Sequence, residues 1–231
     1  MRILVIGDIH GHNGWEKVVF KEDWDKVVFL GDYFDNYKNT PGKEQVTNFK
    51  EILAMKATHP DKVELLYGNH DHSYLNKERC SGYKWQNQLI YEEVLKEAKD
   101  KGWLRLVYIH DDIIFSHAGV SSYWLKEVAQ LVYPQDITWE NVPLDKLNFN
   151  ELTGYNPFGD TPTQSPIWIR PTSLLQYPID GYRQVVGHTH MKVPVNRDGV
   201  WFNDMMPKYY IIIEDGNIKY KKNEIESSES I

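Results

Sequence analysis

The chain has 231 residues, of which 41% are hydrophobic, and a formal net charge of −7 at pH 7. This length suits one domain of generous size, with room for an insertion. The acidic balance excludes a general nucleic-acid groove, because binding to a phosphate backbone needs concentrated Lys and Arg. It does not exclude a phosphorylated substrate, since bound divalent cations reverse the sign of the charge locally.

The cysteine content and the first residues indicate the cellular compartment in which we expect the protein. With Cys80 alone, no disulfide can form within the chain, and nothing requires an oxidising environment. The apolar run after Met1 is too short for the core of a signal peptide, and no stretch approaches the length that spans a membrane. We therefore expect a soluble, cytoplasmic protein without membrane partners.

Short apolar runs recur along the chain, and most end at Gly or at a polar residue with catalytic potential. Five of them are Ile3–Ile6, Val27–Leu30, Val63–Tyr67, Ile113–Phe115 and Gln184–Val186. Runs this short and rich in Val and Ile are typical of buried strands. A following Gly permits a sharp turn out of the sheet.

Helical patterns lie between these runs. One helical face is formed by Val46, Phe49, Leu53 and Ala57, and His59-Pro60 ends that helix. A second stripe, closed by Gly102, consists of Trp85, Leu89, Val94 and Ala98. A third helix is expected to begin at a cap formed by Ser121 or Ser122 and to run to about Tyr133.

The later part of the chain is richer in strands. The expected strands are Tyr108–Ser116, Val200–Asn203, Tyr209–Glu214 and Ile218–Lys221. Asp215-Gly216 between the last two predicts a hairpin turn. Strands that first alternate with helices and then follow one another predict an α/β fold with mixed sheets covered by helices.

The stretch 134–171 is rich in Pro, Asn, Asp and aromatic residues and shows no clean period. Compact domains seldom carry so long an irregular segment. We interpret it as an insertion near the functional site, acting as a lid, or alternatively as a loosely packed surface excursion. Residues 1–221 are expected to form a single domain, and the charged, Ser-rich end at 222–231 a flexible tail.

Five polar motifs follow the first set of apolar runs. They are Gly7-Asp8-Ile9-His10-Gly11, Gly31-Asp32-Tyr33-Phe34-Asp35-Asn36, Gly68-Asn69-His70-Asp71, Ser116-His117-Ala118-Gly119 and Gly187-His188-Thr189-His190. Taken singly, most have an ordinary structural explanation, because Gly-Asp and Gly-Asn pairs are common turn formers. Together they indicate one site, because strand ends gather at one rim of a sheet.

The residue types in these motifs favour a metal centre. Two Asp, one Asn and four His form a mixed nitrogen and oxygen set, which suits Mn, Fe or Zn better than Ca or Mg. Seven ligands are too many for one ion and suit two ions that share a carboxylate.

The five motifs, in this order and approximate spacing from Asp8 to His190, resemble those of the calcineurin-like metallophosphoesterase superfamily. They are most similar to the branch that holds the PPP-type Ser/Thr phosphatases and the bis(5′-nucleosyl)-tetraphosphatases. The resemblance implies a four-layer α/β/β/α sandwich, in which helices flank two mixed β-sheets. This agrees with the pattern of strands and helices above.

The resemblance also implies the ligand roles. Both metals would share Asp32. Metal one would add Asp8, His10 and His190. Metal two would add Asn69, His117 and His188. Two divalent ions, with Mn²⁺ expected and Fe or Zn as alternatives, would hold a bridging hydroxide that attacks phosphorus.

In the family, the histidine after the ligand asparagine is a general acid held by a carboxylate. The matching residues are His70 and Asp35, and a nearby carboxylate raises the pKa of a histidine. The alternative is that His70 merely orients the metal ligands.

Two positions depart from the family. The chain has Asn36 where PPP phosphatases carry a phosphate-clamping Arg, and Asp71 where they carry Glu. Arg170 is the best replacement clamp, because a guanidinium suits bidentate phosphate contact. Its alternative role is a surface salt bridge.

These features predict a hydrolase of phosphomonoesters, with a phosphoprotein or a small phosphorylated molecule as its partner. The alternative substrates are phosphodiesters or dinucleoside polyphosphates, whose base the aromatic-rich insertion would stack. A non-catalytic protein-binding scaffold is a third hypothesis. Loss of metal ligands would mark such a scaffold.

Overall fold

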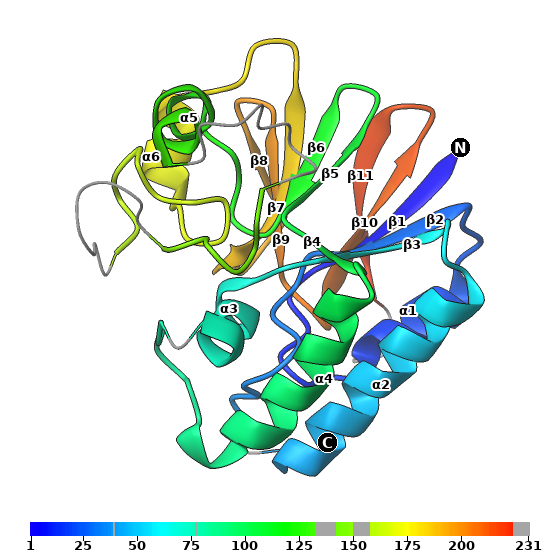
Figure 1. The fold of residues 1–231 in the computed structure, drawn as a ribbon. Coiled ribbons are helices and arrows are strands. Elements are labelled where there is room, and N and C mark those ends of the chain that lie inside the picture. The colour runs from blue at the N-terminus through cyan, green and yellow to red at the C-terminus, as the bar shows by residue number, and fades with distance from the viewer. Residues whose placement is uncertain (39, 77, 133–141, 150–157, 224–231) are drawn as a thin grey trace.

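The computed structural model describes residues 1–38, 40–76, 78–132, 142–149 and 158–223 (Figure 1). The strands are β1 Arg2–Ile6, β2 Lys26–Phe29, β3 Val63–Leu66, β4 Leu104–Arg105, β5 Val107–His110, β6 Ile113–Ser116, β7 Arg183–His190, β8 Val195–Arg197, β9 Val200–Asp204, β10 Tyr209–Glu214 and β11 Asn217–Lys222. The helices are α1 Gly14–Lys21, α2 Gly42–Thr58, α3 Asn69–Asn76, α4 Gln88–Asp100, α5 Ala129–Val132 and α6 Pro171–Gln176, with a 3₁₀ turn η1 at Trp85–Asn87 and a π-helical segment η2 at Trp124–Val128.

The described strands form two sheets, and both are mixed. Sheet A has the order β11-β10-β1-β2-β3-β4, and sheet B has the order β5-β6-β7-β9-β8. In sheet A, β1 is parallel to β2 and antiparallel to β10. In sheet B, β7 lies between two parallel neighbours, while the hairpins add antiparallel edges. The predicted pair of mixed sheets is therefore confirmed.

The two sheets pack face to face through apolar side chains that alternate along the strands. On β1, Ile3 and Val5 join Phe115 and Val185 of sheet B in one buried cluster. The intervening residues of β1 point to the opposite face, where they meet the helices. This alternation follows from the two-residue period of a strand, and it places sheet A between a helical layer and sheet B.

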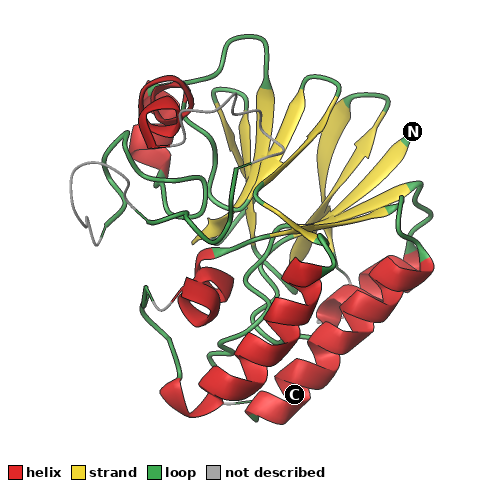
Figure 2. Cartoon of the chain, in the orientation of Figure 1, coloured by secondary structure: helices red, strands yellow, loops and turns green. Residues whose placement is uncertain are grey.

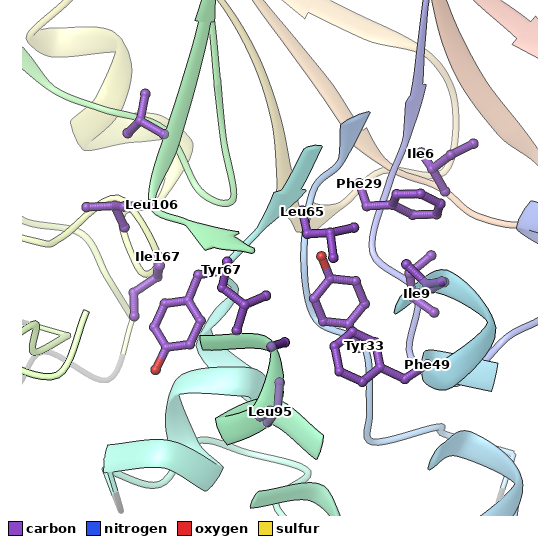
Figure 3. Packing of buried hydrophobic residues seen from close by; sticks show 14 of the residues in the cluster. Ile6, Ile9, Phe29, Tyr33, Phe49, Leu65, Tyr67, Leu95, Leu106 and Ile167 are labelled. Carbon is purple, nitrogen blue, oxygen red and sulfur yellow. The ribbon is translucent and has the colours of Figure 1, made fainter. Parts of the chain in front are cut away.

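Helices cover the outer faces of both sheets, which confirms the predicted four layers. Helices α1, α2 and α4 lie along sheet A (Figure 2). Leu174 of α6 packs with Val186 and Phe202 on the outer side of sheet B. Figure 3 shows the larger cluster, in which Tyr33 and Phe49 meet with ring centroids 4.4 Å apart. This contact supports the loop that follows β2.

The second helical stripe was predicted correctly only in part: Val94 and Ala98 are buried, but its first two residues are not. Trp85 and Leu89 are 77% and 80% exposed. Trp85 lies in η1, before α4 begins at Gln88. Leu89 precedes Val94 by five residues, a spacing that places the two on different faces of the helix. The buried face has the spacing i, i+3, i+4, i+7 and consists of Tyr91, Val94, Leu95 and Ala98.

Two predicted strands have different limits in the structure. The run Tyr108–Ser116 is a hairpin rather than one strand, because the chain reverses between His110 and Ile113, with Asp111 at a φ of 51°. Strand β7 does not end at Gly187 but continues to His190, with a register shift after Val186. The predicted turn at Asp215-Gly216 is confirmed.

The third helix begins as predicted at a serine cap. The hydroxyl of Ser121 accepts a hydrogen bond from the backbone N–H of Trp124 at 3.0 Å. The helix continues to Val132, and its predicted end at Tyr133 lies outside the described residues.

The described parts of the 134–171 segment pack against the body of the protein. Phe149 and Trp168 are buried and stack with ring centroids 4.2 Å apart. Residues 134–141 and 150–157 lie outside the described residues, as does the tail beyond Asn223. None of the helices that the structure describes is long and apolar enough to cross a membrane.

We expect Phe49→Ala to lower the free energy of unfolding by about 3–5 kcal/mol, because a fully buried ring would leave a cavity beneath Tyr33. Chemical denaturation measures the loss. Phe20→Ala is the matched control, since Phe20 on α1 is 87% exposed, and it should change stability by less than about 0.5 kcal/mol. Equal losses in both variants would contradict the packing described here.

Candidate metal centre

The predicted motifs meet at one rim of the two sheets. Four of them follow β1, β2, β3 and β6, and the fifth is the end of β7. They surround a cavity of about 640 Å³. Its wall carries the predicted site residues apart from Asp35 and His117, which are buried behind it. The structure therefore brings together side chains that are up to 182 positions apart in the chain.

The backbone at these positions is unusual. Four site residues have a positive φ, which side chains other than glycine rarely adopt: His10 (41°), Asp32 (52°), Asp35 (67°) and His188 (62°). Such conformations cost free energy and cluster at functional sites. Close approach adds a second constraint, because a Cβ on Gly187 would lie 2.0 Å from Oδ1 of Asp8. The surrounding fold therefore holds the loops in place.

Backbone carbonyls orient two of the imidazoles. Nδ1 of His10 lies 2.8 Å from the carbonyl oxygen of Phe34, and Nδ1 of His117 lies 2.8 Å from that of Leu30. Each Nδ1–H donates to its carbonyl, which leaves Nε2 with a free lone pair. The two Nε2 atoms lie 3.7 Å and 3.4 Å from Oδ2 of Asp32. This is the orientation that a metal ligand needs.

Two further ligand atoms, from Asn69 and His188 of the cavity wall, converge near Nε2 of His117. Oδ1 of Asn69 lies 2.8 Å from both Nε2 of His117 and Nδ1 of His188. The other nitrogen of His188 lies 3.2 Å from the carbonyl of Trp168, to which it donates. With both imidazoles neutral, three lone pairs face one another, and a cation satisfies all of them. The residues present therefore fit the second metal that the motifs imply.

Buried carboxylates complete the set. Asp8 accepts the backbone N–H of His188, and Asp32 accepts that of His70 at 2.9 Å. Two triads of described residues have ligand atoms within 4.8 Å of one another: His10, Asp32 and His70, and Asp8, Asp32 and His117. Asp32 belongs to both triads, which is the position of a shared ligand.

His190 differs from the other predicted ligands. It lines the cavity, but its side chain is 70% exposed, and its Nδ1 lies 3.8 Å from Oδ2 of Asp204. Neither triad contains it. Its role as a ligand of metal one stays a prediction.

The charges in the site are set by burial and by the carboxylates. Burial lowers the pKa of His10 to about 4 and that of His188 well below its usual range, so both are neutral near pH 7. Although burial acts in the opposite direction, Asp32 and Asp8 raise the pKa of His117 to about 9. A proton on His117 thus partly neutralises these carboxylates when no metal is bound.

His70 belongs to a chain of hydrogen bonds. Its Nδ1 lies 2.7 Å from Oδ2 of Asp35, whose Oδ1 accepts the hydroxyl of Tyr74 at 2.5 Å. Despite burial, Asp32 and the hydrogen bond with Asp35 raise the pKa of His70 well above its usual value. Tyr74 was not predicted, although its spacing offers a signal: it lies four residues after His70 on α3 and so shares its face.

The two departures from the family motif have structural roles. Asn36 is buried, and its side-chain amide donates to the carbonyl of His10 at 2.8 Å. It therefore holds the first motif and is not directed at a substrate. Asp71 accepts backbone N–H groups from Asp32, Tyr33 and Gly68 at 2.9–3.0 Å, which ties the second motif to the third.

Arg170 lines the same cavity as most of the predicted metal ligands. Its Nη1 donates to the carbonyl of His188 and to the hydroxyl of Thr189 at 3.2 Å and 3.1 Å. The side chain is half-buried and lines the cavity. Both contacts involve Nη1, and the role of Arg170 as a clamp stays a prediction beside the alternative of a salt bridge.

Two other cavity residues were missed from the sequence. Asp204 ends β9 opposite His190, and its position after the predicted strand Val200–Asn203 matches the rule that found the five motifs. Tyr37 follows Asn36 and lies edge-on to His10, with ring centroids 5.0 Å apart. Nothing in its local sequence signals that position.

A comparison with protein families identifies the chain. Residues 1–192 match the family model described as calcineurin-like phosphoesterase. This match covers most of the sequence and contains all five motifs. The chain belongs to the calcineurin-like phosphoesterase family.

Individual relatives are more distant. A probable serine/threonine-protein phosphatase of Encephalitozoon cuniculi (strain GB-M1) is 35% identical over 78 residues, which are 32% of this chain and 16% of that protein. A genome polyprotein of Peanut mottle virus (strain M) is 32% identical over 114 residues, which are 48% of this chain and 3% of the polyprotein. The matched regions are thus small parts of both relatives.

Solved structures show the same fold. A cold-active protein-tyrosine phosphatase of a psychrophilic Shewanella species has a TM-score of 0.59 at 17% identity, covering 96% of this chain and 77% of that one. A protein serine/threonine phosphatase of Saccharomyces cerevisiae has a TM-score of 0.58 at 16% identity, covering 96% and 79%. At this identity the likeness concerns the fold alone.

Metal binding should become tighter as pH rises. A metal needs the neutral form of His117, whose pKa is about 9 without metal, so binding below that pH releases a proton. The apparent affinity for Mn²⁺ should rise by about tenfold per pH unit between about pH 6 and pH 9, and then level off. Calorimetric titration in buffers of different ionisation enthalpy measures both affinity and released protons. An affinity independent of pH would contradict this assignment.

Proposed function

We propose that the chain is a phosphomonoesterase that works with two divalent cations, with Mn²⁺ as the expected metal and Fe or Zn as alternatives. Its main support is the convergence of Asn69, His117 and His188 beside the buried carboxylate of Asp32. A mixed nitrogen and oxygen set of this kind suits these metals. The chain retains every ligand of the family pattern, which disfavours a non-catalytic scaffold.

The cations, when bound, supply Lewis-acid activation of a water molecule and of the phosphoryl group. The first would be held by Asp8, His10, Asp32 and His190. The second would be held by Asp32, Asn69, His117 and His188. The carbonyls of Phe34, Leu30 and Trp168 keep the imidazoles of His10, His117 and His188 turned toward these positions.

His70 serves as the general acid in this proposal. Asp35 holds Nδ1–H and stabilises the imidazolium, so that Nε2 is left to donate its proton to the leaving oxygen. The hydroxyl of Tyr74 fixes the rotamer of Asp35 through its second oxygen. The acid is therefore positioned before a substrate arrives.

Arg170 acts as the phosphate clamp in place of the arginine that Asn36 replaces. Nη1 is held by the carbonyl of His188 and the hydroxyl of Thr189. Because the guanidinium group is planar, its remaining N–H groups are directed toward the cavity that Arg170 lines. A phosphoryl group bound there would lie beside the ligands of both metals.

A substrate panel tests this function. Mn²⁺-loaded protein should hydrolyse aryl phosphates and phosphopeptides faster than bis-aryl phosphodiesters or dinucleoside polyphosphates. Asp32→Asn removes the shared anion and should lose metal, as measured by elemental analysis, together with at least about 10³-fold in rate. Faster cleavage of the diesters or polyphosphates would favour the alternative substrate class. Near wild-type turnover of Asp32→Asn would overturn the site.

His70→Ala should retain bound metal but lose about 10²–10⁴-fold in kcat for substrates with poor leaving groups. The loss should shrink with a good leaving group, such as 4-nitrophenolate, because that group departs without a proton. Tyr74→Phe should show the same dependence on the leaving group to a smaller degree. If His70→Ala instead loses metal, its role is to orient the ligands rather than to donate a proton.

A further inference from the structure

Tyr37 is a large, exposed aromatic residue at the edge of the site. It is 69% exposed, and of the exposed large apolar side chains among the described residues, it is the one that lines the cavity. Neither the packing of the fold nor the catalytic roles proposed above require it. An exposed aromatic ring in a cavity is a common means of binding a flat apolar group.

The ring lies on the side of the cavity where the leaving group departs. His10 contacts both the proposed acid His70, with ring centroids 4.9 Å apart, and Tyr37, with ring centroids 5.0 Å apart. A Cβ on Gly82 would lie 3.1 Å from Cε1 of His70 and 4.0 Å from Cε1 of Tyr37. A side chain at Gly82 would therefore crowd the imidazole of His70, and the glycine lets this part of the chain approach both rings.

The backbone that presents Tyr37 is held in place. Its neighbour Asn36 donates through its side chain to His10, and its carbonyl accepts Nζ of Lys84 at 2.7 Å. The backbone N–H of Asn36 donates to Oε1 of Gln45. These contacts fix the chain immediately before Tyr37, so a ring that stacks on it loses less free energy to ordering.

We propose that Tyr37 forms a binding subsite for an aromatic leaving group, so that the preferred substrates are aryl phosphates of the phosphotyrosine type. This inference rests on the phosphomonoesterase function proposed above. In the reaction, water adds its oxygen to phosphorus while the bond from phosphorus to the phenolic oxygen breaks. The phenol takes a proton from His70, and the proton lost by water restores it, so no co-reactant is needed.

An aromatic leaving group gains a contact that an alkyl one does not. The ring of an aryl phosphate is attached directly to the oxygen that His70 protonates, so it enters the cavity that His70 and Tyr37 both line. Aromatic pairs with centroids roughly 4.5–7 Å apart gain stabilisation beyond the area that they bury. The side chain of phosphoserine is too short to place an apolar group there.

Binding of two phosphonates to the Mn²⁺-loaded chain tests the subsite without turnover. Phenylphosphonate and methylphosphonate share the anionic group but differ in the ring. In calorimetric titrations, the native protein should bind the phenyl compound about tenfold more tightly. Tyr37→Ala should bring this ratio to about one, whereas Tyr37→Phe should keep it. Phe20→Ala, which removes an exposed ring outside the cavity, should leave it unchanged.

If Tyr37→Ala keeps the native ratio of affinities for the two phosphonates, even while it weakens both equally, the subsite is overturned. Failure of either phosphonate to bind, together with no hydrolysis of any phosphomonoester, would instead overturn the proposed function. Hydrolysis rates of a phosphotyrosine peptide, of a phosphoserine peptide with the same sequence and of phenyl phosphate show whether the aromatic ring belongs to a protein or to a small molecule. Preference for the phosphotyrosine peptide would support a protein substrate, and preference for phenyl phosphate a small one; both support the subsite. Faster cleavage of the phosphoserine peptide than of both aryl substrates would contradict it.

Discussion

The buried carboxylate of Asp32 is the group on which the arrangement of the site depends. One oxygen accepts the backbone N–H of His70, and the other faces Nε2 of His10 and of His117. An isolated anion in a dry interior is very costly. The loops after β1, β3 and β6 must therefore bring donors or cations to the loop after β2. A cation shared between two triads satisfies this requirement better than protonated imidazoles do.

The two sheets make this convergence possible. Parallel strands β1, β2 and β3 in sheet A, and β6 and β7 in sheet B, end at one rim, so each loop adds its ligand to the same small volume. The strained backbone at His10, Asp32 and His188 persists because rigid strands hold both ends of each connection. Asp71 adds a polar tie between two of these connections.

Local sequence predicted which side chains gather at the rim, because each of the five motifs lies at the end of a strand that its own apolar residues define. Tyr37 was harder to find, because it reaches the cavity from the loop after β2, whose direction no local pattern reveals. Asp204 follows the predicted strand Val200–Asn203, and the same rule would have found it. The buried face of α4 was predicted only in part, because the stripe joined residues five positions apart, a spacing that does not stay on one side of a helix. The role of Asn36 is likewise visible only once His10 lies beside it.

Trp168 connects parts of the site that lie far apart in the sequence. Its ring stacks on Phe149, its carbonyl accepts a hydrogen bond from His188, and Arg170 follows two residues later. A cation that orders His188 therefore also orders the backbone that carries the arginine. If the proposed metal site and clamp are correct, occupancy of the second metal position and affinity for phosphate would be thermodynamically linked, and each would strengthen the other by the same factor. One carbonyl group would then connect the cofactor with the substrate.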